Sequence, residues 1–328
     1  MSNRHLYNIT KIKYFFLGGI ALALNLLFIY VASPAEIPKH EVHQPVLVFV
    51  SDTQSPMWIE TLKLKSDRNN DATDAIFHSI LSEPNVAALF HLGDITAMGS
   101  FESEWETIDS YLSLLQDSSI SFFPVPGNHD YYIFPQRGRE AFLKRFSFCE
   151  PSWYVVKKGN IAVVLLNSNF SRLSEEERKT QQQWFESQIL TLEQDSIISS
   201  IIIGTHYSPF TNSTIVDPST EVQEAFVPVF LQCNKCKLFL SGHAHAFEHF
   251  QKGGKDFVVL GGGGGLLHPL LLGAERRWVD LFPNATERRM FHYILCEQRG
   301  EFLNLTVKML NPDYRSFTSV YEINFEEK

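Results

Sequence analysis

Short continuous apolar runs recur along this sequence, and stretches with helical periodicity lie between them. The apolar runs are Val46–Val50, Val86–Leu92, Ile120–Val125, Ile161–Leu166, Ile197–Ile203 and Lys237–Leu240. The helical stretches lie near Asp71–Leu81, Glu102–Leu115, Gln136–Phe146 and Glu175–Leu190, and Ser174 with Glu177 forms a capping-box pattern before the last of them. Apolar runs of this length are typical of strands covered on both faces. The alternation therefore predicts an α/β fold built on a layered sheet.

The last part of the chain has a different pattern. After Gly261–Gly265, three segments alternate apolar and polar residues with no strong helical stretch between them, namely Arg288–Cys296, Phe302–Leu310 and Phe317–Phe325. A period of two residues is typical of half-buried strands. These segments predict a second, largely antiparallel sheet that closes the domain.

Polar clusters follow five of the apolar runs directly. They are Ser51–Gln54, Gly93–Asp94, Gly127–Asp130, Thr205–Pro209 and Ser241–His245. Ligands of open α/β sheets bind outside the carboxyl ends of the strands, so we expect these clusters to converge on one crevice. The converging groups would be two carboxylates, two amides and four imidazoles, which are ligands for divalent ions such as Mn, Fe and Zn.

Each cluster also has a structural interpretation when it is taken alone. Asp52 could cap a helix, Gly93-Asp94 could form a routine turn, and His206 could be a core histidine. The pair His243 and His245 is more specific, because alternate residues of a strand point to the same side. Since five strand ends carry such groups in one chain, a shared metal site explains them better than five separate accidents.

The quoted motifs resemble a known signature. Asp52-x-Gln54, Gly93-Asp94, Gly127-Asn128-His129-Asp130, His206 and Gly242-His243-Ala244-His245 are similar to the motifs of calcineurin-like metallophosphoesterases, which include purple acid phosphatases and cyclic-nucleotide phosphodiesterases. The resemblance covers residues 46 to about 265. It implies a four-layer α/β/β/α sandwich with a dinuclear metal centre, two divalent ions (Mn, Fe or Zn), and a small phosphorylated substrate.

The resemblance also implies a role for each matching residue. One metal would be held by Asp52, Gln54, Asp94 and His245, and Asp94 would bridge to a second metal held by Asn128, His206 and His243. His129 would stay off the metals and face the leaving group as a general acid. The implied reaction is hydrolysis of a phosphomonoester or phosphodiester, by attack of a metal-bridging hydroxide on phosphorus.

Three departures from the family pattern are visible. Gln54 stands where the family more often has histidine, and a neutral amide oxygen is a weaker ligand. Ala97 stands where many relatives have an aspartate that orients the catalytic histidine. Ile95–Met98 lacks the tyrosine of purple acid phosphatases, so we expect no Fe(III) chromophore. The first two departures leave open an alternative, an inactive metal-binding ectodomain with a role in structure or ligand capture.

The N-terminal region predicts a membrane segment. Tyr14–Ala32 contains 19 residues without a charge, which as a helix would span roughly 28 Å. Lys11 and Lys13 precede it, so the N-terminus is expected in the cytoplasm. A retained single-pass signal anchor is one interpretation, and a signal peptide cleaved near Ser33-Pro34-Ala35 is the other. The predicted organisation is a cytoplasmic 1–13, a membrane or signal segment 14–32, a linker 33–45, and an extracytoplasmic catalytic domain 46–328.

The net charge argues against one class of partner. The chain has a formal charge of −9, and residues 1–13 contain three basic side chains and no acid, so the remainder carries −12. A domain with a net negative charge repels the phosphate backbone of nucleic acids, so no nucleic-acid partner is expected.

The cysteines leave two possibilities open. Cys233 and Cys236 form one CxxC pair, and the other cysteines, Cys149 and Cys296, do not form a second. A structural zinc site is therefore poorly supported. The pair is either two thiols or, in an exported domain, a local disulfide.

Overall fold

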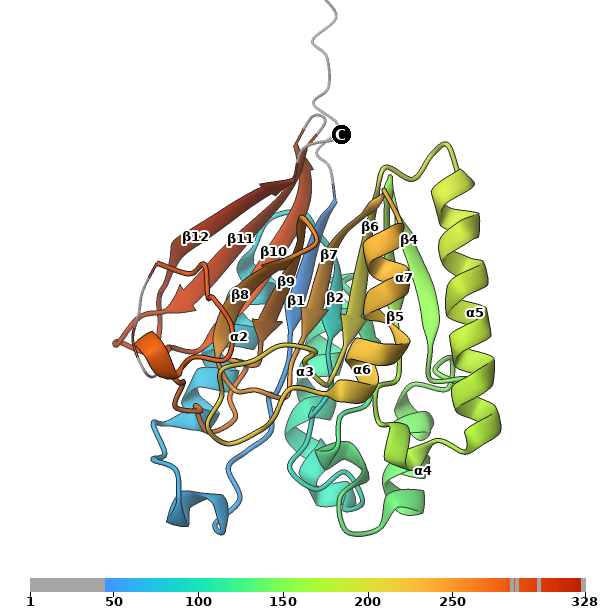
Figure 1. Cartoon of the computed structure of the whole chain (residues 1–328). Coiled ribbons are helices and arrows are strands. Elements are labelled where there is room, and N and C mark those ends of the chain that lie inside the picture. Colours follow the sequence, from blue (N-terminus) through green and yellow to red (C-terminus); the bar gives the residue numbers. More distant parts are fainter. Residues whose placement is uncertain (1–44, 284–285, 287–288, 300–301, 326–328) are drawn as a thin grey trace, which may run out of the picture. The chain divides into compact units, whose positions relative to one another are not determined.

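We describe a computed structural model of the protein, which covers residues 45–283, 286, 289–299 and 302–325. Two six-stranded sheets organise this region (Figure 1). The first sheet has the order β12 (Phe317–Phe325), β11 (Phe302–Leu310), β10 (His292–Arg299), β1 (Val46–Val50), β2 (Val86–His91) and β3 (Ser121–Pro124). The second has the order β4 (Tyr154–Lys158), β5 (Ile161–Leu165), β6 (Ser200–Thr205), β7 (Cys236–Ser241), β9 (Lys255–Leu260) and β8 (Phe247–Lys252).

Both sheets are mixed. In the first, β1, β2 and β3 are parallel, and in the second, β5, β6, β7 and β9 are parallel. Antiparallel strands complete the edges, because β4 pairs with β5 and β8 pairs with β9. The predicted apolar runs thus form the parallel strands β1, β2, β5, β6 and β7 in the interior of the two sheets, and β3 at the edge of the first.

The three C-terminal strands correct one prediction. They do not form a sheet of their own, because β10 pairs antiparallel with β1, with Leu47 opposite Cys296 and Phe49 opposite Ile294. They therefore extend the first sheet and satisfy the backbone groups along the free edge of β1. The second sheet is built from the middle of the chain instead. Alternation predicts that a segment is a strand, but it does not say which strand will be its neighbour.

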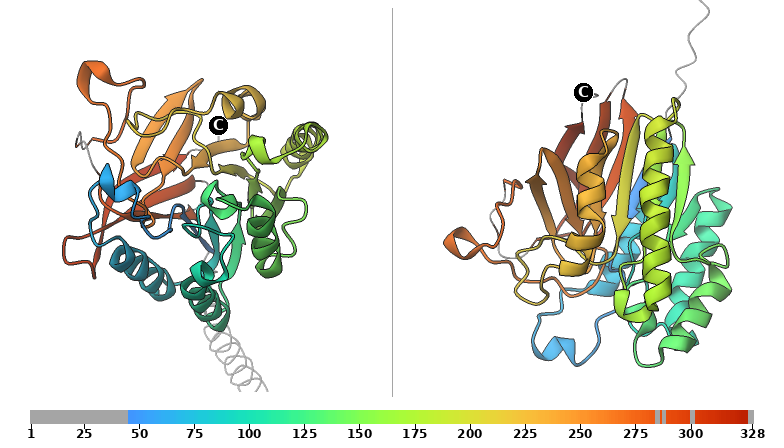
Figure 2. Two further views of the ribbon diagram at one scale, coloured as in Figure 1. Left: turned by 90° about the horizontal axis from the view of Figure 1, so that it is seen from below. Right: turned by 45° about the vertical axis from the view of Figure 1, so that its right-hand side comes forward.

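Helices cover the outer faces of the two sheets, as the view from below shows (Figure 2). The first sheet packs against α2 (Asn69–Ser82), α3 (Glu106–Asp117) and α4 (Pro135–Arg145), and the second against α5 (Glu175–Gln194), α6 (Thr220–Ala225) and α7 (Val227–Gln232). Side chains of both sheets, such as Phe49, Phe90 and Leu240, form the core between them. The layers are therefore helices, sheet, sheet and helices.

The predicted helices are present with small shifts of their ends. The capping box at the start of α5 is confirmed, because Ser174 Oγ accepts from the Glu177 N–H and Glu177 accepts from the Ser174 N–H. The pattern missed β4, β8, β9, α6 and α7, which are short or contain charged residues. The described 3₁₀ turns are η1 (Glu60–Leu62), η2 (Glu102–Trp105), η3 (His129–Tyr131), η4 (Phe170–Arg172) and η5 (Gly273–Glu275).

Two further predictions concern the N-terminus and the cysteines. The predicted membrane segment 14–32 lies outside the described residues. Within the part of the chain that the structure describes, no helix is long and apolar enough to cross a membrane. Cys233 and Cys236 are buried free thiols in this structure, and the Cys236 N–H donates to Cys233 Sγ.

Glu248 is a buried carboxyl in β8. It accepts hydrogen bonds from Thr211 Oγ1 at 2.5 Å and from the Asn212 N–H at 2.9 Å. Burial raises the pKa of Glu248 from 4.5 to about 7, although these two hydrogen bonds lower it. The neutral carboxyl therefore stabilises the fold in full below pH 4.5, and this stability is lost as the pH rises through 7.

Glu248→Gln should flatten the dependence of stability on pH. Glutamine keeps the acceptor oxygen but cannot ionise, so the fall of about 2–3 kcal/mol that Glu248 contributes between pH 5 and pH 8 should disappear. Urea denaturation of both proteins at several pH values measures this effect. Parallel stability curves for the two proteins would show that Glu248 does not titrate in this range.

Candidate metal centre

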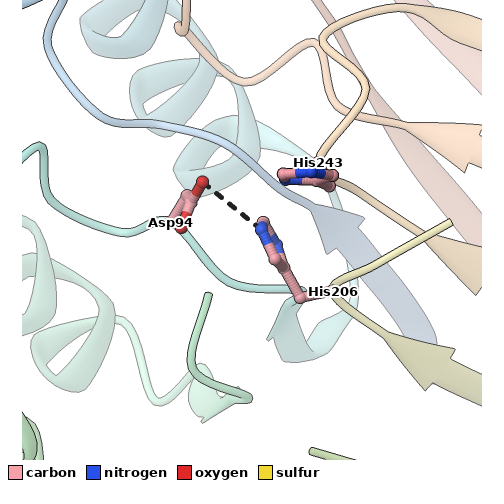
Figure 3. Close-up of side chains that lie close together, drawn as sticks. All are labelled: Asp94, His206 and His243. Carbon is pink, nitrogen blue, oxygen red and sulfur yellow. Dashed lines mark ion pairs between the residues drawn. The ribbon is translucent and has the colours of Figure 1, made fainter. Parts of the chain in front are cut away.

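The polar residues that follow β1, β2, β3, β6 and β7 meet at the carboxyl ends of these strands. One strand-end group combines Asp94 after β2, His206 after β6 and His243 after β7 (Figure 3). Their ligand atoms all lie within 4.8 Å of one another. His206 Nε2 is 3.3 Å from Asp94 Oδ2 and 3.1 Å from Asn128 Oδ1. The two sheets thus bring together residues separated by about 150 positions in the sequence.

A second group shares Asp94 with the first. It consists of Asp52, Asp94 and His245, whose ligand atoms also lie within 4.8 Å of one another. His245 Nε2 is 3.4 Å from Asp52 Oδ1. All three side chains are buried. Asp94 lies where the two groups join, so one carboxylate can serve two neighbouring cations.

Hydrogen bonds to backbone carbonyls determine which imidazole nitrogen faces the centre. His206 Nδ1 lies 2.8 Å from Leu92 O, and His245 Nδ1 lies 2.9 Å from Leu266 O. In the neutral imidazole, Nδ1 then donates its hydrogen and Nε2 keeps a lone pair. Both Nε2 atoms face carboxylates of the site, which is the arrangement that metal-ligating histidines usually have.

Gln54 also turns an acceptor towards the centre. When its amide donates to Asp94 O at 3.1 Å and to Asp52 O at 3.3 Å, its oxygen lies 3.2 Å from His245 Nε2. At this distance the amide oxygen accepts from a protonated His245 Nε2, and the same oxygen can bind a cation when Nε2 carries no proton. The replacement of histidine by Gln54 therefore leaves a ligand atom in place.

Charge and burial agree with a cation site. Asp94 Oδ2 is buried without a hydrogen-bond partner among the described residues, so it is available for an ion. Burial raises the pKa of Asp94, but the charges of His206 and His129 outweigh this and lower it. For His206, burial lowers the pKa, but the charge of Asp94 and its hydrogen bond outweigh burial and raise the pKa to about 9. The residues present fit two divalent cations, because buried carboxylate and imidazole ligands converge there and Asp94 Oδ2 has no hydrogen-bond partner among the described residues.

The backbone is strained at three of these residues. Asp52, Asp94 and His243 have φ angles of 60°, 53° and 65°, in the left-handed region that few residues other than glycine adopt. Such strain occurs at functional sites, where the surrounding structure holds it. Gly127 allows the close approach beside Asp94, because a Cβ at this position would lie 2.1 Å from Asp94 Oδ1.

His129 lies beside the metal-ligand groups and belongs to neither. Its Nε2 is 4.0 Å from Asp94 Oδ2 and 3.9 Å from Glu60 Oε1, and its backbone N–H donates to Asp94 Oδ1 at 2.7 Å. Its Nδ1 is 2.9 Å from the backbone oxygen of Ala97. A main-chain carbonyl therefore orients this ring at the position where many relatives would use an aspartate side chain.

Sequence reasoning missed two residues that support the site. Asp130 accepts from the backbone N–H groups of Asp94, Ile95 and Gly127, and so ties the turn after β2 to the turn after β3. It belongs to the quoted motif, which is the signal that could have found it. His268 stacks on His245 with ring centroids 4.3 Å apart. No spacing in the sequence links these two histidines.

Divalent metal should stabilise the fold. At a Mn²⁺ concentration a hundredfold above the dissociation constant, the free energy of unfolding should rise by about 2.7 kcal/mol for each occupied site. Asp94→Asn should lose most of this gain, and Asp195→Asn, at a partly buried residue outside the centre, should keep it. Chemical denaturation with and without Mn²⁺ measures the effect. An unfolding midpoint that does not move with metal would contradict the assignment.

Comparison with known structures identifies similar folds, although no curated protein matches the sequence. The anchor protein GAP50 of the inner membrane complex of Plasmodium matches with a TM-score of 0.64 and 14% identity, over 87% of this chain and 90% of that one. Purple acid phosphatase PPD1 from yellow lupin seeds matches with a TM-score of 0.62 and 14% identity, over 86% and 54%. A dimetal phosphatase from Danio rerio matches with a TM-score of 0.58 and 14% identity, over 87% and 100%. These likenesses concern the fold.

The sequence profile described as Calcineurin-like phosphoesterase matches residues 45–247. This range contains the strands β1–β7 and every residue of the two ligand groups. It agrees with the two mixed sheets and with the buried cluster at their strand ends. This chain belongs to the calcineurin-like phosphoesterase family.

Proposed function

We propose that this chain is a metal-dependent phosphoesterase that hydrolyses a phosphomonoester or a phosphodiester. The observation that supports this best is the position of Asp94, a buried carboxylate shared by two groups of candidate ligands with His129 at its side. Two divalent ions bound there would neutralise the phosphoryl oxygens and lower the pKa of a water molecule. The family and the dimetal phosphatase fold support the same function.

Different residues of the site would bind the metals and donate the proton. Asp52, Gln54, Asp94 and His245 would hold one ion, and Asp94, Asn128, His206 and His243 the other. In the hydrolysis, a water oxygen forms a bond to phosphorus while the bond to the leaving oxygen breaks. His129 in its doubly protonated form would give its Nε2 proton to that oxygen, because the Ala97 carbonyl holds the Nδ1 hydrogen.

Turnover of an aryl phosphate tests the proposal. Purified protein loaded with Mn²⁺ is assayed on p-nitrophenyl phosphate and on bis-p-nitrophenyl phosphate side by side, and then with other divalent metals. We expect release of nitrophenolate well above that of the variant that combines His129→Ala with Asp94→Asn. Equal release by both proteins would reject the enzyme function.

Two observations favour a second candidate, a metal-binding domain without activity. The similar structure with the TM-score of 0.64 is an anchor protein of a membrane complex, and Gln54 is a weaker ligand than the histidine usual in the family. In such a domain the metals would serve structure or ligand capture. Metal-dependent stabilisation without turnover of either ester would support this candidate, whereas turnover excludes it.

The cellular location is a proposal drawn from the sequence. The uncharged segment Tyr14–Ala32 preceded by Lys11 and Lys13 supports a catalytic domain outside the cytoplasm, either anchored by this single span or released after cleavage. Protease accessibility in intact cells tests the side of the membrane, and the mass of the mature protein tests cleavage. A domain protected from external protease in intact cells would contradict the location.

A further inference from the structure

A cavity of about 270 Å³ lies beside the metal centre, on the side of the second sheet. His243 forms part of its wall and also belongs to the Asp94 ligand group. Tyr207 and Phe170 line it as well, and the Tyr207 ring lies 4.3 Å from the His243 ring between centroids. A group attached to a phosphorus bound at the centre can therefore extend past His243 into this cavity.

His129 and this cavity lie at opposite ends of a row of contacts. His129 approaches Asp94, Asp94 pairs with His206, the His206 ring contacts the His243 ring at 5.1 Å, and His243 contacts Tyr207. The leaving group belongs at the His129 end, where the proton is supplied. The cavity at the other end is therefore suited to a substituent that stays on phosphorus, which only a phosphodiester has.

A buried serine hydroxyl lines this cavity, and its hydrogen is free to donate to a ligand. Ser168 is 2% exposed and lines the cavity. Its oxygen accepts from the backbone N–H groups of His206 at 3.1 Å and Tyr207 at 2.8 Å. Both bonds use the oxygen as the acceptor, and the described residues include no acceptor for its hydrogen. Ser168 can therefore donate to an oxygen of a bound ester.

The charged residues that line the cavity indicate the charge of the substituent that it would bind. Glu221 and Asp217 contribute carboxylates to its lining. Asp217 pairs with Arg277 at 3.1 Å, whereas Glu221 contacts the hydroxyls of Ser219 and Thr220 and has no cationic partner among the described residues. Burial and the charge of Asp94 raise the pKa of the Tyr207 phenol to about 12, while Glu221 raises it less and Arg172 lowers it. Glu221 is thus the acid available to a cation.

We propose that this cavity binds the retained ammonium-bearing substituent of a phosphodiester, with Ser168 on an ester oxygen and with Phe170, Tyr207 and Glu221 around the cation. Aromatic faces and a carboxylate are the groups that recognise quaternary ammonium ions. The inference rests on the proposed phosphoesterase function and narrows it to diesters of amino alcohols. Water supplies the oxygen that binds phosphorus, the other alcohol leaves with a proton, and the product is the phosphomonoester of the amino alcohol.

The test compares two diesters of the same shape. The p-nitrophenyl diester of phosphocholine carries a quaternary ammonium, and the p-nitrophenyl 3,3-dimethylbutyl phosphate has carbon in place of that nitrogen. With the Mn²⁺-loaded full chain, we expect kcat/KM to be about tenfold higher for the choline ester. Glu221→Gln should reduce this ratio to about two or less. Glu224→Gln, one turn further along α6, is the matched control and should leave the ratio unchanged.

Binding provides a second readout that does not need turnover. Calorimetry with phosphocholine and 3,3-dimethylbutyl phosphate should show tighter binding of phosphocholine, and Glu221→Gln should remove the difference. Equal kcat/KM values, or equal affinities when neither ester is hydrolysed, would overturn the ammonium site. Preferential binding of phosphocholine without hydrolysis of any ester would support the ammonium site and reject the enzyme function. Failure of the ammonium site and failure of the phosphoesterase function therefore give different results.

Discussion

Replacing Asp94 with asparagine is expected to lower kcat/KM for p-nitrophenyl phosphate by about a thousandfold or more. Asp94 is the only described residue common to both ligand groups, and its Oδ2, which has no hydrogen-bond partner among the described residues, faces them. Asparagine has nearly the same size and still offers an oxygen to the His129 N–H. The variant should therefore fold, while both cations lose the charged ligand that they share.

The measurement combines kinetics with metal analysis. Asp94→Asn should retain less than one metal ion per chain after gel filtration, under conditions in which the unchanged protein retains about two. Asp195→Asn, which alters a partly buried aspartate at the end of α5 that pairs with Lys157, is the control and should keep both activity and metal. Full activity in Asp94→Asn would show that the shared carboxylate has no part in the reaction.

Replacing His129 with alanine is expected to slow the hydrolysis of alkyl phosphates by about 10²–10⁴-fold. An alkoxide is a poor leaving group and needs a proton as it departs, and His129 Nε2 is the nitrogen oriented to supply it. A nitrophenolate leaves without protonation, so the loss with p-nitrophenyl phosphate should be much smaller. Because His129 belongs to neither ligand group, the metal content should not change.

The diagnostic quantity is the dependence of kcat on the acidity of the leaving alcohol. A series of phosphate esters with leaving groups from phenols to simple alcohols gives this slope for the unchanged protein and for His129→Ala. We expect a steeper slope in the variant. His78→Ala removes an exposed histidine of α2 and should leave the slope unchanged. Equal losses with aryl and alkyl esters would assign His129 to substrate positioning.

The orientation of His129 shows where sequence reasoning reaches its limit. From the sequence, Ala97 is a missing aspartate, and the partner of His129 has no visible candidate. In the structure, the Ala97 carbonyl lies 2.9 Å from His129 Nδ1 and takes the place of the missing side chain. Every residue has a backbone carbonyl, so no residue pattern can indicate which one will point at a given ring.

The cavity beside His243 was equally hidden in the sequence. Ser168 lies in the loop after β5, whereas Glu221 lies in the first turn of α6, and no motif connects them. They share one cavity because the loops after β5 and β6 cross the same end of the second sheet. Side chains contributed by such loops depend on loop conformation, which local sequence patterns do not specify.

The sequence by itself determined the parallel strands except β9, the helices α2 to α5 and the chemistry at the strand ends. These depend on the period of apolar residues and on groups adjacent in the chain, including Asp52, Asp94 and His243-Ala244-His245, which local rules describe. Only the tertiary structure decided that β10 joins β1, that Asp94 lies where two ligand groups meet, and that Ala97 orients His129. These features depend on contacts between segments far apart in the chain, where the packing of two sheets sets distances that sequence spacing does not encode.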